Sequence, residues 1–120
     1  MVLVDTSVWI SHLREGNPQL VELLNNGDVV CHPFVIGELA CGNMKNRNEI
    51  LSLLHSLPGA ETAEHDEVLR FIEHNRLMGT GLGIIDVHLL TSAILSDIFL
   101  WTMDNSLKRA ASQLNVEYKP

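Results

Sequence analysis

The sequence predicts an α/β fold in three layers, with a short central parallel sheet flanked by helices. Three short apolar runs have the length of buried strands, at residues 2–5, 29–31 and 98–101. The segments between them carry apolar residues at helical spacing. Short apolar strands that alternate with helices are typical of a parallel sheet covered on both faces. A chain of 120 residues fits one domain, so we expect a single domain over 1–120.

The first half of the chain carries two predicted strands and four predicted helices, whose ends are marked by capping or helix-breaking residues. Thr6 or Ser7 can cap the first helix, and Pro18 and Pro33 can start the next two. In order, the elements are a strand at 2–5, helices that begin at 6 or 7 and at 18, a strand at 29–31, a helix from 33 to about 42 and a helix at 46–57.

The second half is predicted to hold three helices, of which the one at 84–95 is apolar on nearly every side and therefore buried. The glycine-rich loop at 79–83 follows a helix rather than a strand, so we expect no dinucleotide site there. The other predicted elements are a brief strand at 60–63, a helix at 64–78, a strand at 98–101, a helix at 104–114 and an edge strand at 116–118.

Composition excludes several classes of protein. The chain is 46% hydrophobic and 19% charged, which argues against disorder. We expect no signal peptide and no membrane span, and therefore a soluble, cytoplasmic protein. Cys31 and Cys41 are expected to be reduced core thiols, because their spacing does not fit a zinc site. The six histidines are scattered, and we expect them on the surface or satisfied in the core.

The net charge of −7 disfavours a broad basic face for non-specific binding of nucleic acid. It does not exclude an enzyme that acts on nucleic acid. If four carboxylates bound divalent metal, eleven acids would remain against eight bases. Part of the acidic excess is therefore compatible with a metal site.

Four carboxylates stand at positions where a carboxylate needs a partner. Asp5 and Asp104 follow apolar strands, at the edge of the sheet where α/β proteins bind ligands. Glu38 lies within an apolar helix, and Asp86 lies near the start of the most apolar one. Each alone can be a helix cap, a dipole partner or a solvent-exposed acid. If they converge, a cation must offset their repulsion, and oxygen ligands favour Mg²⁺ or Mn²⁺.

The four acids lie in the segments L-V-D-T-S, V-I-G-E-L, G-I-I-D and T-M-D-N-S-L. In this order and spacing, the segments resemble the PIN-domain family, and more narrowly the VapC-type toxins of prokaryotic toxin–antitoxin pairs. The resemblance covers essentially the whole chain. It implies a PIN-like fold and a Mg²⁺- or Mn²⁺-dependent endoribonuclease. The implied catalytic and metal-binding residues are Asp5, Glu38, Asp86 and Asp104, supported by Thr6, Ser7 and Thr102.

The resemblance also implies an RNA substrate, a VapB-type antitoxin that silences the toxin, and a homodimer. Candidate phosphate contacts are Arg14, Lys45, Arg47, Lys108 and Arg109, although each is equally compatible with a solvated surface base. Apolar stripes on the helices can form a groove for an amphipathic antitoxin segment, although such stripes are usually core. The groove candidates are Trp9, Leu13, Leu20, Leu24, Leu51 and Leu54.

The same acids are compatible with a PIN-fold binding module that has weak or no nuclease activity. All four acids are intact, which favours the enzyme. A receiver domain would need an acidic pair after the first strand, and a haloacid-dehalogenase phosphatase would need Asp-x-Asp there. Asp5 is preceded by Val4 and followed by Thr6 and Ser7, so we expect neither.

Overall fold

Three short parallel strands form the centre of the molecule in the computed structural model, which describes residues 1–120. β1 (Val2–Val4) lies between β2 (Val29–Val30) and β3 (Phe99–Trp101). Val2 pairs with Val29 on one side and with Phe99 on the other. Because all three strands run in the same direction, their carboxyl ends meet at one edge of the sheet.

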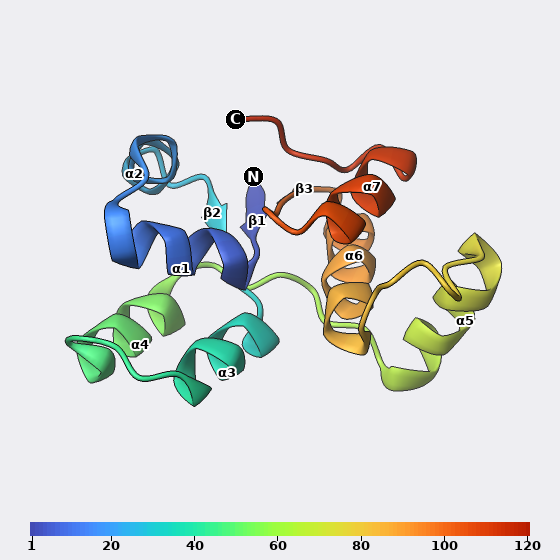
Figure 1. Cartoon of the computed structure of the whole chain (residues 1–120), viewed down its shortest axis with the longest axis horizontal. Coiled ribbons are helices and arrows are strands. Elements are labelled where there is room, and N and C mark those ends of the chain that lie inside the picture. The colour runs from blue at the N-terminus through green and yellow to red at the C-terminus, as the bar shows by residue number, and fades with distance from the viewer.

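Seven helices flank this sheet, and Figure 1 shows α1 to α4 on one side of it and α5 to α7 on the other. The prediction of a three-layer α/β fold is confirmed. The helices are α1 (Thr6–Glu15), α2 (Pro18–Asn25), α3 (Pro33–Cys41), α4 (Arg47–Ser56), α5 (His65–Asn75), α6 (Ile84–Ser96) and α7 (Asn105–Gln113). No helix is long and apolar enough to cross a membrane.

A cluster of 24 buried apolar residues joins the sheet to the helices on both sides. All three residues of β1 are buried, as a central strand covered on both faces requires. In α6, every residue from Val87 to Ala93 is buried, which confirms the prediction for this helix. This core fixes the sheet edge to which α1, α3, α6 and α7 bring the four acids.

Three predicted elements differ from the structure. The predicted strand at 60–63 does not form, although Gly59 just before it makes a single bridge to Cys31. The predicted strand at 116–118 is reduced to a single bridge between Glu117 and Leu100. The chain therefore extends the sheet at both edges only briefly. The helix predicted over 64–78 ends at Asn75, because Arg76 has a left-handed backbone (φ 54°).

The two cysteines are free, as predicted, but only one belongs to the core. Cys31 is buried at the end of β2, where burial raises the pKa of its thiol. Cys41 is exposed at the last position of α3, so its prediction as a core thiol is wrong. The residues of α3 that are buried in the core are Val35 and Leu39.

Candidate active site

Asp5 lies at the carboxyl end of β1 and caps the first turn of α1. The residue is 6% exposed, and its Oδ1 accepts a hydrogen bond from the Thr6 N–H at 2.8 Å. The Asp5 N–H donates to the Trp101 carbonyl at 2.9 Å, which ties the end of β1 to the end of β3. A buried carboxylate is stable only with such partners. The backbone therefore fixes one oxygen of Asp5.

The other Asp5 oxygen, Oδ2, accepts hydrogen bonds from two hydroxyl groups. Ser7 Oγ donates at 2.8 Å and Thr102 Oγ1 at 2.7 Å. Each hydroxyl also accepts a backbone N–H from the loop after β3. Met103 N–H donates to Ser7 Oγ and Asp104 N–H to Thr102 Oγ1, both at 3.0 Å. Ser7 and Thr102 thus couple Asp5 to the backbone of the loop that carries Asp104.

Glu38 is an exposed residue of α3 that is held beside Asp5 by Thr6. The Thr6 hydroxyl donates to Glu38 Oε1 at 2.7 Å, while the Thr6 N–H donates to Asp5. Asp104 is also exposed and caps α7, where its Oδ2 accepts the Leu107 N–H at 2.9 Å. Both acids keep a carboxylate oxygen that makes no hydrogen bond within the protein.

The surroundings of Asp86, in the first turn of α6, disfavour the charged form of its carboxyl. Burial is the largest cause that raises the pKa of this carboxyl, and the charges of Asp5, Asp104 and Glu38 raise it further. The Gly83 N–H, which donates to Asp86 Oδ2 at 3.2 Å, acts in the opposite direction. In Figure 1, α1 and α3 face α6 across the centre of the molecule. The four acids therefore share one electrostatic site.

This site offers oxygen ligands only, which suits a hard divalent cation such as Mg²⁺ or Mn²⁺. No three acidic, histidine or cysteine side chains lie close enough together to hold one ion in this structure. Each of the four acids instead accepts a hydrogen bond from a hydroxyl or a backbone N–H. The residues thus fit a divalent cation by donor chemistry and shared charge, and side-chain rotation would have to bring their oxygens together.

Two of the five candidate phosphate contacts share a groove with one of the four acids. Arg14 and Lys45 line the same groove of about 470 Å³ as Glu38, between α1, α3 and the segment after α3. Positive charges beside an acidic site provide a path for a polyanion. The groove therefore joins these two bases to Glu38.

The other three candidates lie elsewhere. Arg47 donates through Nη2 to the Ala40 carbonyl at 2.7 Å and so satisfies the C-terminal end of α3. Lys108 and Arg109 are exposed on α7, and Lys108 lines a separate depression near the C-terminal segment. Arg47 therefore has a structural role that the sequence did not predict.

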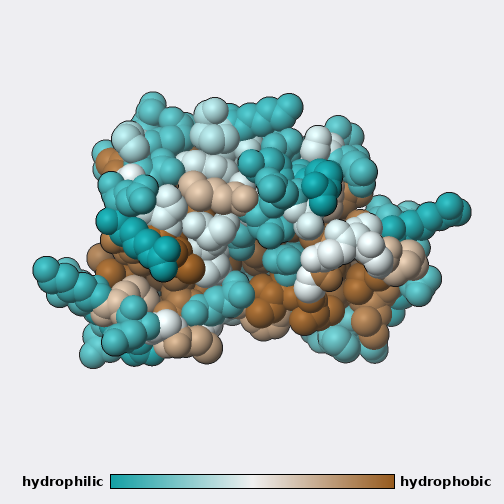
Figure 2. Space-filling model, in the orientation of Figure 1, coloured by the Kyte–Doolittle hydropathy of each residue, from teal (hydrophilic) through white to brown (hydrophobic).

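An apolar groove of about 370 Å³ runs between α1, α2 and α4. On this side of the molecule, Figure 2 shows patches of hydrophobic atoms interrupted by hydrophilic ones. Leu20 does not line this groove because it is fully buried in the core, and half-buried Leu51 packs against the core outside the lining. Leu13 lines both this groove and the one that holds Glu38. Four of the six groove candidates do line the apolar groove: Trp9, Leu13, Leu24 and Leu54.

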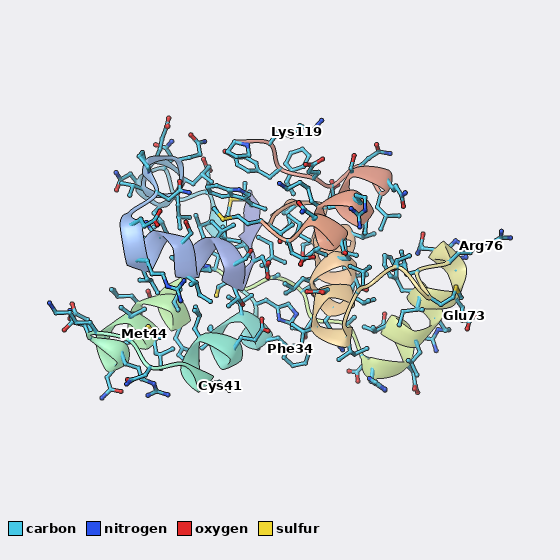
Figure 3. The ribbon with its side chains drawn as sticks, viewed as in Figure 1. Phe34, Cys41, Met44, Glu73, Arg76 and Lys119 are labelled. Atoms are coloured by element: carbon cyan, nitrogen blue, oxygen red, sulfur yellow. The ribbon has the colours of Figure 1, made fainter.

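Sequence reasoning missed an aromatic group at this site. His32 caps α3 and is fully buried, with a ring Nε2 that has no hydrogen-bond partner. The expectation of a satisfied core histidine is therefore wrong for His32. The ring of Phe34 packs against those of His32 and His88, and Figure 3 shows Phe34 between α3 and α6. The sequence does carry a signal for Phe34. It precedes Glu38 by four residues in one predicted helix, which places both residues on the same helix face.

Comparisons with known proteins agree with this geometry. Residues 2–113 match the family model of the PIN domain. Ribonuclease VapC32 from two strains of Mycobacterium tuberculosis, CDC 1551 / Oshkosh and ATCC 25618 / H37Rv, is 49% identical over 117 residues, or 97% of this chain and 94% of the relative. The crystal structure of PAE2754 from Pyrobaculum aerophilum aligns with a TM-score of 0.65 at 19% identity, over 90% of this chain and 82% of that one, which shows the fold alone.

A parallel sheet with an acidic carboxyl edge, together with the family match, defines the class: the chain belongs to the PIN-domain family. Its similarity to ribonuclease VapC32 over nearly the whole chain confirms the narrower prediction of a VapC-type nuclease toxin. Ribonucleases of this type generally depend on divalent metal, which agrees with the oxygen-only donor set.

Proposed function

We propose that this protein is the toxin of a type II toxin–antitoxin pair and a Mg²⁺- or Mn²⁺-dependent endoribonuclease that acts in the cytoplasm. It hydrolyses RNA phosphodiesters at Asp5, Glu38, Asp86 and Asp104. The observation that carries the proposal is that the charges of three other acids raise the pKa of the Asp86 carboxyl, in a chain that is 49% identical to a ribonuclease.

The four acids have different tasks in this proposal. Asp5 is the fixed reference, because three donors hold its two oxygens. Glu38 and Asp104 are exposed and keep one oxygen each for a ligand, and Asp86 completes the set from α6. Together these acids would hold a divalent ion, which would supply a water activated for attack and positive charge for the phosphate. The carboxylates orient that centre, and no histidine or lysine base is required.

The substrate is single-stranded or looped RNA. Asp5 is buried and Asp86 is half-buried, so a phosphate must enter between α1, α3 and α6 to reach them. The backbone of a paired helix is held in a regular duplex, whereas an unpaired strand can bend into such a site and present its bases. On one side of the scissile phosphate, the RNA passes from Glu38 along the groove lined by Arg14 and Lys45.

The function is tested by incubating the purified chain, freed of any bound partner, with cellular RNA in Mg²⁺, Mn²⁺ or EDTA. We expect cuts at defined positions only when metal is present. Because water is the attacking group, no cyclic phosphate forms, and with the 3′-oxygen as the leaving group the cut ends should carry a 5′-phosphate and a 3′-hydroxyl. Cyclic phosphate ends, or cuts that persist in EDTA, would indicate attack by the RNA's own 2′-hydroxyl. Metal binding without cleavage of any RNA would favour the inactive binding module.

Removing the positive charge of Arg14 or Lys45 should weaken RNA binding and reduce its dependence on salt. Each phosphate contact on a single strand contributes about 0.7 to the slope of log affinity against log salt concentration. We therefore expect Arg14→Ala and Lys45→Ala each to lower that slope by about 0.7, measured by titration with a short single-stranded RNA. Arg70→Ala is the matched control, because Arg70 lies on α5 away from the groove. Equal slopes in all variants would remove this groove from the RNA path.

The apolar groove is proposed to bind a VapB-type antitoxin. It is lined by seven apolar residues, and Leu13 also lines the neighbouring groove that holds Glu38. An amphipathic segment can bury its apolar side there and extend a basic side chain toward the carboxylates. Such a segment would occupy the RNA path and the metal site together, which accounts for silencing.

Leu53→Glu should separate antitoxin binding from catalysis. Leu53 is 61% exposed and lines the apolar groove, so the substitution places a charge in the interface without disturbing the core. We expect antitoxin affinity to fall by at least about tenfold and RNA cleavage to stay unchanged. The measurement is calorimetric titration with the cognate VapB-type antitoxin. Leu69→Glu, an exposed leucine on α5, is the control, and equal affinity for both variants would place the antitoxin elsewhere.

We also propose that the chain forms a homodimer. Large apolar side chains are exposed on α6, where Ile84 is 46%, Leu95 43% and Ile94 41% exposed. A second copy that covers such residues would remove apolar area from water. Sedimentation of the purified chain distinguishes a dimer from a monomer directly.

A further inference from the structure

Phe34 is an exposed aromatic side chain on α3, the helix that carries Glu38. It is 40% exposed and lies four residues before Glu38 on α3. Residues at this spacing share one face of a helix, with Cβ atoms about 5–6 Å apart. Figure 3 shows Phe34 between α3 and α6, the helix that carries Asp86. Its ring therefore stands where α3 and α6 open toward the solvent.

Two imidazole rings hold the Phe34 ring without covering it. The ring centroids are 5.2 Å apart for His32 at an angle of 55°, and 4.7 Å apart for His88 at 72°. Neither imidazole is parallel to the phenyl ring, so neither stacks on its face. The backbone at Phe34 is also fixed, because its N–H donates to His32 Nδ1 at 3.0 Å. The ring is thus prepositioned, with aromatic surface left open.

His32 behaves as a neutral support rather than a charged contact. Burial, with the charge of His88 as a lesser cause, lowers the pKa of His32 to about 4. The residue is 1% exposed, so it cannot reach a ligand itself. At neutral pH its uncharged ring accepts the Phe34 N–H and packs against the phenyl ring. The feature that a ligand meets is therefore Phe34.

Gly37 adds a second observation on the same face of α3. A glycine within a helix reduces helix stability compared with alanine. A Cβ at Gly37 would meet no atom within 4 Å, so packing within the chain does not require glycine there. Gly37 lies three residues after Phe34 and adjoins Glu38. The bare backbone at this point leaves room for a ligand to approach α3 closely.

We propose that Phe34 and Gly37 form a nucleobase subsite, in which the base next to the scissile phosphate stacks on Phe34 and its ribose passes over Gly37. The inference rests on the proposed function and specifies how that site holds its RNA. A nucleotide whose phosphate lies at the carboxylates must place its base nearby, and Phe34 is the exposed aromatic ring on the helix that carries Glu38. Stacking tolerates any base, so the subsite favours unpaired RNA rather than one sequence.

The test compares Phe34→Ala, Phe34→Leu and Phe34→Trp by cleavage kinetics and by binding of a short single-stranded RNA that contains 2-aminopurine. Stacking on an aromatic ring quenches the fluorescence of this base. We expect Phe34→Ala to raise KM and the RNA dissociation constant by about tenfold to a hundredfold and to abolish the quenching. Phe34→Trp should match the wild type, whereas Phe34→Leu should resemble Phe34→Ala, because leucine keeps the apolar volume without a π face.

Two further variants give the comparison its controls. Phe99→Ala removes a phenyl ring that is 50% exposed at the amino end of β3, at the edge of the sheet opposite the acids, and should change neither KM nor quenching. Gly37→Ala should melt at the same or a higher temperature than the wild type and yet raise KM. A Gly37→Ala variant with unchanged KM would remove Gly37 from the subsite.

The possible outcomes separate this inference from the proposed function. A wild type that cuts RNA, with Phe34→Leu or Phe34→Ala equally effective, overturns the subsite and leaves the nuclease intact. A change of sedimentation in Phe34→Ala with unchanged RNA affinity also overturns it, by assigning Phe34 to an interface between copies. Quenching that depends on Phe34 in a protein that cuts no RNA supports the subsite while the nuclease proposal fails.

Discussion

Asp86→Asn should raise the thermal stability of the metal-free protein while RNA cleavage falls by at least about a hundredfold. Burial and three neighbouring carboxylates raise the pKa of Asp86 in the folded state. The fold therefore disfavours the ionised form of the Asp86 carboxyl. Asparagine removes the charge and can still accept the hydrogen bond from the Gly83 N–H. Cleavage is lost because the amide is a much poorer metal ligand.

The pH dependence of stability has a definite sign. A carboxyl with a raised folded-state pKa contributes most stability below its unfolded pKa, near the ordinary value of 3.8. That contribution is lost as the pH rises through the folded-state pKa. In EDTA, wild-type melting temperature should therefore decline over this interval more steeply than that of Asp86→Asn.

Melting curves in EDTA and in Mg²⁺ measure both effects. The wild type should gain stability on addition of Mg²⁺, and Asp86→Asn should gain little. Asp97→Asn is the matched control, because Asp97 caps the other end of α6 in a left-handed conformation that asparagine also adopts. An Asp86→Asn variant that melts below the wild type in EDTA and keeps its cleavage would show that Asp86 is a structural acid.

Thr102→Val should weaken both the fold and the catalytic site. Valine keeps the shape of the side chain but removes a donor to Asp5 and the acceptor of the Asp104 N–H. An unsatisfied buried polar group costs about 1–3 kcal/mol, so we expect the free energy of unfolding to fall by that amount. Cleavage should fall by about tenfold to a hundredfold, because Thr102 orients the acids without being one of them.

Two further variants identify the cause of this effect. Thr91→Val removes another buried threonine hydroxyl, which donates only to the Val87 carbonyl within α6, and should leave cleavage nearly unchanged. Ser7→Ala combined with Thr102→Val should be non-additive, because both hydroxyls donate to the same oxygen of Asp5. Additive effects, or a Thr102→Val variant with wild-type cleavage and melting, would contradict the coupling of Asp5 to the β3–α7 loop.

The sheet and its helices were predictable because burial leaves a periodic trace in the sequence. Val2–Val4 and the apolar face of α6 have patterns that only a covered sheet and a buried helix explain. The strand predicted at 116–118 was not reliable, because its pairing with Leu100 depends on where α7 ends. The end of α5 was missed because Arg76 carries no glycine-like signal for its left-handed backbone.

The acids were predictable for a different reason. Asp5 and Asp104 follow strands, and the carboxyl edge of a parallel sheet collects whatever follows its strands. Their hydrogen bonds were not predictable, because the meeting of Ser7 with Thr102 depends on the register of β1 and β3. The same limit applies to Leu20, which periodicity could not assign to core or groove, and to Arg47, whose carbonyl partner is defined by the turn between α3 and α4.

The most direct test of the proposed metal site is the rate of RNA cleavage by the wild type and by Asp86→Asn as Mg²⁺ is added to EDTA-treated protein. We expect the wild-type rate to rise from the background and saturate, and the variant rate to stay at the background over the same range. Equal wild-type rates with and without Mg²⁺, or a variant that cuts as fast as the wild type, would contradict the proposal that these four carboxylates form a metal-dependent ribonuclease centre.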